Sequence, residues 1–156
     1  MTSEPQVTLT VAVGDLPSVA GSSFGPSSWR AISQAEVSAY ADLAGDHNPV
    51  HLDEEFARGT PFGGTIVHGY LTLSLVVPLM AEVFEVTGAS VGINYGLDRL
   101  RFPAPVPVGS RVRVRGEVLE VDEIPGGYQV HPRVTFEIEG APKPACVADM
   151  VLRYYL

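Results

Sequence analysis

A carboxylate, an amide and an imidazole lie close together in the chain at residues 45–51, GDHNPVH. Asp46, Asn48 and His51 fall within six residues, and Pro49 is incompatible with a helix interior because it lacks an N–H and clashes with the preceding turn. Such groups can hold one water between them, since imidazole exchanges protons near neutral pH and a carboxylate orients or shares the proton. Asp and Asn also favour turns by bonding the nearby backbone. The spacing alone therefore leaves a purely structural role open.

A second feature is the dipeptide His68-Gly69, which we expect to open a helix after the loop at residues 63–67. The first N–H groups of a helix lack intrahelical partners and carry partial positive charge. Glycine lets a ligand approach this backbone closely, and an N–H directed at a carbonyl oxygen would stabilise a developing enolate. Close helix packing explains a glycine here equally well, so both explanations stay open.

Metal and disulfide chemistry are not indicated. The four histidines are His47, His51, His68 and His131, and they show no pair at i, i+4 spacing with a carboxylate on a helix, so we expect no metal site. The single cysteine, Cys146, has no partner for an internal disulfide, and we interpret it as a small hydrophobic residue of a strand.

Composition limits the class of protein. The chain of 156 residues predicts one domain, and its net charge of −8 argues against a generic nucleic-acid binder. Residues 1–98 contain two basic and eleven acidic residues, whereas residues 99–156 contain eight basic and seven acidic residues. The longest uncharged apolar stretch, residues 69–81, is shorter than the roughly twenty residues of a membrane span. Without a basic, apolar leader near residue 1, we expect a cytoplasmic protein that contacts no membrane.

Helical signals surround the candidate residues. Ser33 and Glu36 form a capping-box pattern ahead of a helix that we expect to end at Gly45. Residues 53–58 predict a helical turn. A longer helix is expected from His68 or Gly69 to about Val86, apolar on nearly all faces and therefore buried, with a kink at Pro78.

Strand signals dominate the rest of the chain. Residues 7–13 alternate, and after residue 90 strands are predicted at 91–102, 110–123, 127–139 and 144–155. Successive strands with short turns imply an antiparallel sheet in an α+β layout. We expect the hot-dog fold, in which a long buried central helix is wrapped by a curved antiparallel sheet. Residues 1–21 are interpreted as an N-terminal arm or edge strand, and residues 22–156 as the single domain.

Several blocks of the sequence resemble the MaoC-like hydratases, the hydratase 2 or (R)-specific enoyl-CoA hydratase family. The first two are AGDHNPVHLD at residues 44–53, with Phe56-Ala57 after it, and FGGTIVHGYL at residues 62–71. The block at residues 93–109 is similar to single-hot-dog bacterial members of the nodulation protein N-like subgroup, and residues 143–148 match the last core strand of that subgroup.

The resemblance implies a homodimeric hot-dog enzyme that reversibly hydrates trans-2-enoyl-CoA to (R)-3-hydroxyacyl-CoA with syn geometry. Asp46 and His51 would be the catalytic pair, and Asn48 would help to place the water. The Gly69 N–H would bind the thioester oxygen, and Phe102 would contact the acyl-CoA. One water supplies both added atoms, so no cofactor or metal is expected and the CoA thioester is the substrate.

Two alternatives come from other classes. A hot-dog acyl-CoA thioesterase would share the fold, although thioesterases usually lack the Asp-x-Asn-Pro-x-His turn, and a non-catalytic acyl-CoA-binding module would have kept the fold without turnover. Basic residues in the second half of the chain are candidates to meet CoA phosphates, with a solvated strand face as the alternative for each. They are Arg99, Arg101, Arg111, Arg113, Arg115, Arg133 and Lys143.

Overall fold

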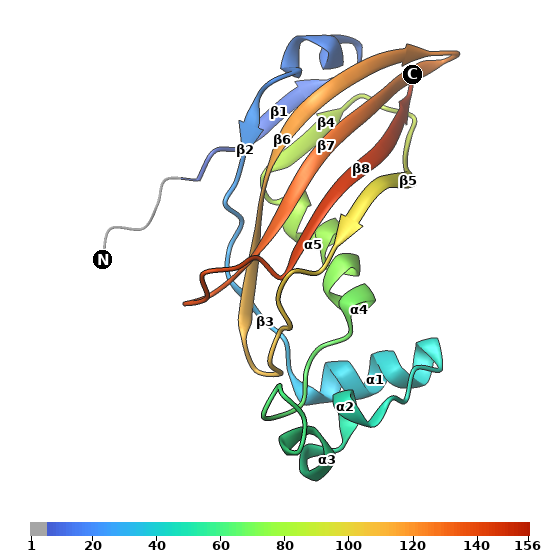
Figure 1. The fold of residues 1–156 in the computed structure, drawn as a ribbon. Helices are drawn as coiled ribbons and strands as arrows, with labels where there is room; N and C mark the ends of the chain where they lie inside the picture. Colours follow the sequence, from blue (N-terminus) through green and yellow to red (C-terminus); the bar gives the residue numbers. More distant parts are fainter. Residues whose placement is uncertain (1–5) are drawn as a thin grey trace.

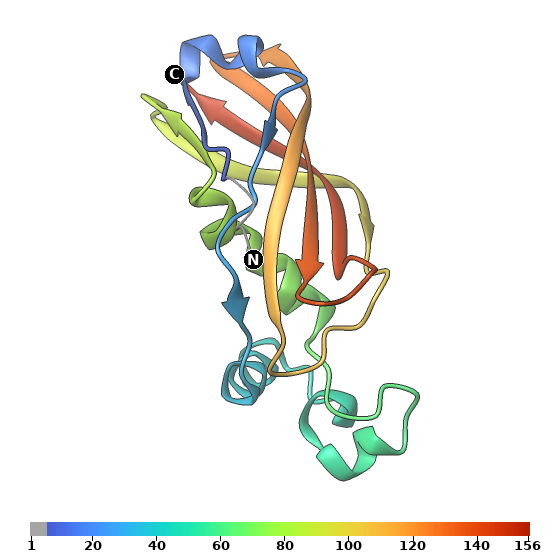
Figure 2. The same cartoon turned by 90° about the vertical axis from the view of Figure 1, so that its left-hand side faces the viewer.

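A curved antiparallel sheet wraps around helical segments in the computed structural model, which describes residues 6–156 (Figures 1 and 2). Its strand order is β2-β6-β7-β8-β5, and β3 also pairs with β6. The strands are β2 (Ser23–Phe24), β3 (Arg30–Ala31), β5 (Val91–Arg101), β6 (Arg111–Ile124), β7 (Gly127–Ile138) and β8 (Cys146–Tyr155). The predicted α+β arrangement is confirmed, and the four long strands lie within two residues of their expected bounds.

The sheet forms because its strands alternate between an apolar inner face and a charged outer face. Along β6, Val112, Val114 and Val118 are fully buried, whereas the arginines between them face outward. Neighbouring strands β7 and β8 pair in antiparallel register, so their own buried residues extend the same apolar layer. Cys146 is fully buried at the start of β8, as its interpretation as a small strand residue requires, and burial raises the pKa of its thiol to about 11.

The expected single helix over residues 69–86 is wrong in its extent. The segment forms two short helices, α4 (Gly69–Ser74) and α5 (Val76–Ala81), and then strand β4 (Phe84–Thr87). Pro78 supplies the physical reason, because it donates no backbone hydrogen bond and its ring crowds the carbonyl four residues earlier. The interruption falls at Leu75, in the turn before Pro78.

Burial of the two helices is also partial. Val76 and Leu79 are buried, whereas Tyr70 and Val77 are 68% and 57% exposed. The expectation of apolar contact on nearly all faces is therefore wrong for α4 and α5. No helix within residues 6–156 has the length and apolar character needed to cross a membrane. The cytoplasmic location stays a prediction.

The N-terminal segment packs against the core at one end of the sheet. Strand β1 (Leu9–Ala12) lies within the predicted strand at residues 7–13 and pairs in parallel with β4. The 3-10 helix η1 (Val13–Val19) follows and buries Leu16 completely. Residues 1–5 of the predicted arm lie outside the described residues, and the boundary at residue 21 stays a prediction.

Three helices gather at the opposite end, below the sheet in Figure 1: α1 (Gln34–Ala44), α2 (Pro49–Leu52) and α3 (Glu54–Arg58). The capping box is confirmed, since the Ser33 hydroxyl accepts from the Glu36 N–H while the Glu36 carboxylate accepts from the Ser33 N–H. Residues 45–51 were expected to form a turn, and their last three residues instead belong to the single helical turn α2, because proline is tolerated in the first turn of a helix. These helices and the start of α4 position the candidate residues.

Candidate functional site

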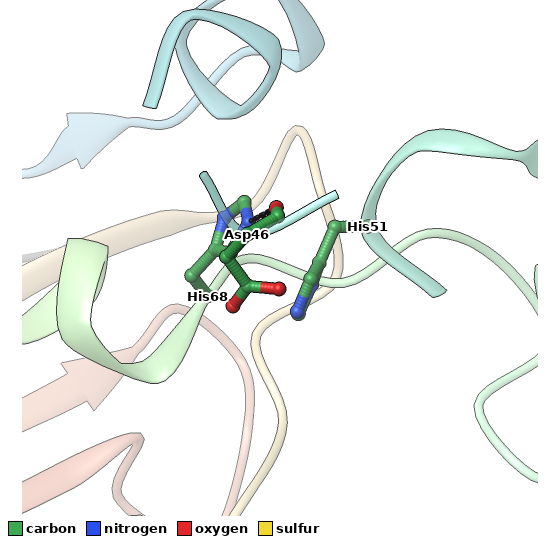
Figure 3. Close-up of side chains that lie close together, drawn as sticks. All are labelled: Asp46, His51 and His68. Carbon is green, nitrogen blue, oxygen red and sulfur yellow. Dashed lines mark hydrogen bonds between the residues drawn. The ribbon is translucent and has the colours of Figure 1, made fainter. Parts of the chain in front are cut away.

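Three ionisable side chains meet between α1, α2 and the start of α4. They belong to Asp46, His51 and His68 (Figure 3). One carboxylate oxygen of Asp46 and one ring nitrogen of each histidine lie within 4.8 Å of one another. Asp46 is exposed, His51 is half-buried and His68 is only 2% exposed. The structure therefore joins the two expected catalytic residues and adds a second imidazole.

The turn at residues 45–50 sets the position of Asp46. Gly45 ends α1 in the left-handed region, with a φ of 72° that favours glycine. The Asp46 carboxylate then accepts a hydrogen bond of 3.3 Å from the Asn48 N–H. The Asn48 side-chain oxygen accepts one of 3.2 Å from the Val50 N–H and so caps α2. The structural role considered for this segment is therefore present, because the Asp46 and Asn48 side chains build their own turn, and the catalytic role stays a prediction.

Backbone chemistry fixes the tautomer of His51. Its Nδ1 lies 2.7 Å from the Ile66 carbonyl oxygen, which only accepts hydrogen bonds, so Nδ1 carries the proton. In the neutral ring Nε2 then holds a free lone pair. Figure 3 shows the Asp46 carboxylate beside this ring. The pair thus presents a proton acceptor and a carboxylate to the same small volume.

His68 links the site to α4. Its Nε2 donates to the Asp46 carbonyl oxygen at 3.0 Å, and its ring stacks on His51 with centroids 3.8 Å apart and planes 29° apart. The Tyr40 ring lies on another side, with its centroid 4.9 Å away. Sequence reasoning identified His68 only as the start of a helix. The only local signal for a role of His68 was its position immediately before Gly69. Its stacking on His51 could not be inferred, because the two residues are seventeen positions apart in the sequence.

Gly69 and Phe102 lie against each other. Gly69 is the first residue of α4, so its N–H has no intrahelical acceptor. A β-carbon at this position would meet the Phe102 ring at 3.1 Å, so the close packing considered from the sequence is present. Phe102 follows directly after β5 and contacts the ring of Tyr70 edge-on, with centroids 6.1 Å apart.

Two cavities meet at Gly69 and Phe102. One, of about 300 Å³, is otherwise lined by His51, Phe62, Ile66, Val67, Thr72, Ala104, Pro105, Val106 and Ala145. The other, of about 480 Å³, is otherwise lined by Tyr40, Ala44, Asp46, His68 and Tyr70. His51 lines the first, more apolar cavity, and Asp46 lines the second, more polar one. The pair therefore lies between the two cavities.

The same trio is a candidate ligand set for a metal ion, which sequence spacing did not indicate. Metals bind imidazole in the ring plane, with a zinc–nitrogen distance of about 2.0–2.1 Å. The planes of His51 and His68, stacked at 3.8 Å and 29°, do not meet at a point that close to both nitrogens. The placed side chains therefore do not fit one shared ion.

Acidic partners occupy most of the basic residues considered for CoA phosphates. On the outer face of the sheet, ion pairs join Arg111 to Glu139, Arg113 and Arg115 to Glu137, and Arg133 to Asp149. The Arg133 guanidinium holds the pKa of Asp149 below its ordinary value. These four arginines therefore already have carboxylate partners on the strand face, and a contact with CoA phosphates stays a prediction. Arg101, directly before Phe102, donates to the Leu100 carbonyl oxygen at 2.7 Å.

Comparisons with family models and with known proteins agree on one family. The family model described as "MaoC like domain" matches residues 15–135. The chain is 46% identical over 144 residues to 3-hydroxyacyl-thioester dehydratase Z of Mycobacterium tuberculosis, covering 92% of this chain and 95% of that protein. It is 38% identical to nodulation protein N of Rhizobium leguminosarum bv. viciae, covering 90% and 89%.

Among solved structures, the (R)-hydratase from A. caviae involved in PHA biosynthesis aligns with a TM-score of 0.70 and 30% identity. The alignment covers 85% of this chain and 94% of that one. The two folds thus agree over nearly the whole of the solved chain.

Proposed function

Because the chain belongs to the MaoC-like dehydratase family, we propose that it catalyses the reversible syn hydration of trans-2-enoyl-CoA to (R)-3-hydroxyacyl-CoA. One observation carries the proposal. The Asp46 carboxylate and the His51 ring lie close together, and each lines one of two cavities that share Gly69 and Phe102. This arrangement offers a place for a water, a place for an acyl chain and a donor for the thioester oxygen.

In the proposed reaction Asp46 and His51 hold one water against the double bond. The water oxygen bonds to C3 as one of its protons passes to the basic member of the pair, and the acidic member delivers a proton to C2 on the same face. Exchange of a proton between the two residues then restores the pair. Asp46 and His51 share the roles of base and acid between them in this proposal. The carbon–sulfur bond stays intact.

The thioester oxygen gains negative charge as the enolate forms. We assign its stabilisation to the Gly69 N–H, which has no intrahelical acceptor. Phe102 packs against Gly69 and is proposed to contact the acyl-CoA. Asn48 is proposed to act through the turn that holds Asp46, and its predicted contact with the water stays a prediction.

We propose that no metal or cofactor takes part, because water supplies every added atom and the two side chains move the protons. Treatment with a chelator should leave turnover unchanged. Loss of activity on chelation, with recovery on adding back a divalent ion, would contradict this part of the proposal.

The direct test is hydration of crotonyl-CoA by the purified protein. We expect loss of the enoyl absorbance and formation of the (R)-alcohol, and nearly complete loss of turnover in Asp46→Asn and His51→Ala with the fold retained. His47→Ala is the matched control, because the His47 ring lies 2.8 Å from Asp42 rather than in the trio. Release of free CoA would indicate the thioesterase alternative. No turnover with substrates from C4 to C16 would favour the binding module.

We further propose that two copies associate through β5, the terminal strand of the sheet. This strand exposes Val91, Ile93, Tyr95 and Leu97, and an open apolar edge is a ready template for pairing. Light scattering should show a dimer that Ile93→Asp dissociates. Val7→Asp, which changes an exposed valine outside β5, should leave it intact. A monomeric wild-type chain at micromolar concentration would overturn the assignment.

A further inference from the structure

A side chain from another helix holds the backbone carbonyl of His51. His51 lies in α2, a helix of four residues, and the last carbonyl groups of a helix have no intrahelical donor. Gln34, the first residue of α1, supplies the missing donor, because its Nε2 donates to the His51 carbonyl oxygen at 2.8 Å. The first helix is thereby tied directly to the backbone of a proposed catalytic residue.

The Gln34 amide has one orientation that suits both of its neighbours. A carbonyl oxygen only accepts hydrogen bonds, so the amide atom that faces His51 is the amino group. The opposite atom, Oε1, then accepts from the Thr65 hydroxyl at 2.9 Å. The Glu54 carboxylate is farther from that hydroxyl, at 3.5 Å. Thr65 is only 8% exposed, so this end of the amide is held in a place that water hardly reaches.

The loop that carries Thr65 also holds the ring of His51. The carbonyl oxygen of the next residue, Ile66, accepts from the His51 Nδ1 at 2.7 Å. The Ile66 N–H donates to the Val50 carbonyl oxygen at 3.2 Å. Residues 65–66 therefore hold His51 at two points, at the ring through Ile66 and at the backbone through Thr65 and Gln34. Two such contacts restrict both the position of the residue and the direction of its ring.

We propose that Gln34 is a positioning residue for the hydration reaction, and that Thr65 acts on His51 through the Gln34 amide. The inference rests on the proposed hydratase function and extends it to two residues that contact neither the water nor the substrate. Other described residues, not Gln34 or Thr65, line the two cavities beside the pair. His51 can exchange protons with the water only while its Nε2 faces that water, and small displacements of a reacting group cost large factors in rate.

The test measures kcat and KM for crotonyl-CoA in variants of Gln34. Gln34→Met keeps the length of the side chain and removes both hydrogen bonds. It should lower kcat about fivefold, the rate equivalent of the bond to the His51 carbonyl, with little change in KM. Gln34→Glu keeps a polar side chain, but an ionised carboxylate has no donor, so this variant should be no more active than Gln34→Met.

Gln129→Met is the matched control, because it makes the same substitution in β7. The Gln129 Oε1 accepts from Arg153 at 2.8 Å, and its Nε2 lies 3.1 Å from the His131 Nε2. This variant therefore also loses two side-chain contacts, and both glutamine variants should melt lower than wild type. Only Gln34→Met should lose turnover. An equal fall in kcat in the two variants would show that lost stability alone slows the reaction, and would overturn the inference.

The link through Thr65 is tested by combining substitutions. Thr65→Val keeps the branched shape and removes the hydroxyl, and should lower kcat in the wild-type chain. In a Gln34→Met background it should lower kcat no further, because residues that act through one contact are not additive. Thr65→Ser keeps the hydroxyl and should hold the wild-type kcat. Full additivity of Thr65→Val and Gln34→Met would contradict the proposed link.

The outcomes separate this inference from the function on which it rests. Hydration of crotonyl-CoA with an unchanged kcat in Gln34→Met would overturn the inference alone. Absence of hydration with every enoyl-CoA would overturn the proposed function and the inference with it.

Discussion

Replacement of His68 tests how the site is held together. The ring donates to the Asp46 carbonyl oxygen at 3.0 Å and stacks on His51 at 3.8 Å, so it braces both members of the proposed catalytic pair. His68→Leu removes the hydrogen bond and the ring contact but keeps an apolar side chain in the buried position. His68→Gln can still donate to the Asp46 carbonyl from its side-chain amide. The two variants therefore separate the hydrogen bond from the stacking.

The expected size of the effect follows from these contacts. A hydrogen bond contributes about 0.5–1.5 kcal/mol net, and an aromatic pair contributes about 0.5–1.5 kcal/mol beyond its buried area. If both contacts hold the reacting geometry, their loss raises the barrier by about 1–3 kcal/mol. Since 1.36 kcal/mol is tenfold in rate, His68→Leu should lower kcat by about 5- to 150-fold. His68→Gln should recover roughly the share due to the hydrogen bond.

The assay is hydration of crotonyl-CoA at saturating and limiting concentrations, so that kcat and KM are separated. A positioning role predicts a lower kcat with little change in KM, because His68 contacts Asp46 and His51 and is not proposed to contact the substrate. His47→Leu is the matched control, since it removes an exposed imidazole next to Asp46 in the chain and should leave kcat unchanged. A folded His68→Leu protein with kcat within about twofold of wild type would refute the reasoning.

Two further predictions concern packing and charge. Gly69→Ala should lower the free energy of unfolding by about 1 kcal/mol, the lower end of overpacking costs, because its β-carbon would meet the partly exposed Phe102 ring at 3.1 Å. Denaturant unfolding should show recovery in Gly69→Ala with Phe102→Leu, and no recovery would contradict the contact. Arg133 lowers the pKa of Asp149 below its ordinary value of 3.8, so its stabilising effect is present above that pH and is lost as pH falls through the lowered pKa. Asp149→Asn should therefore melt lower than wild type at pH 7, and the difference should narrow below pH 3.8; a constant difference would argue against the ion pair.

Local interactions account for what was predictable near the site. The Ser33–Glu36 capping box and the turn that carries Asp46 and Asn48 depend on neighbours within a few residues. Such contacts can be inferred from residue types and spacing, and the structure contains them. Alternation along β6 likewise indicated which side chains point inward, because the side-chain period of a strand is two.

The misjudged helix shows where periodicity is insufficient. Apolar residues over 69–86 indicated burial, but the same pattern is compatible with one helix or with two short helices and a strand. Strand β4 exists because β1, more than seventy residues earlier, offers it a parallel partner. A hydrophobic pattern indicates which residues are apolar. It does not indicate which distant segment will pack against them.

The sequence by itself determined the α+β class, the four long strands, the first helix and the turn that carries Asp46. Only the tertiary structure decided that His68 stacks on His51, that Phe102 packs on Gly69, and that the Thr72 hydroxyl is buried without a hydrogen-bond partner within residues 6–156. The physical reason is the range of the interactions. Capping, turns and alternation act between near neighbours, whereas these three features depend on how the curved sheet and the helices close around one another.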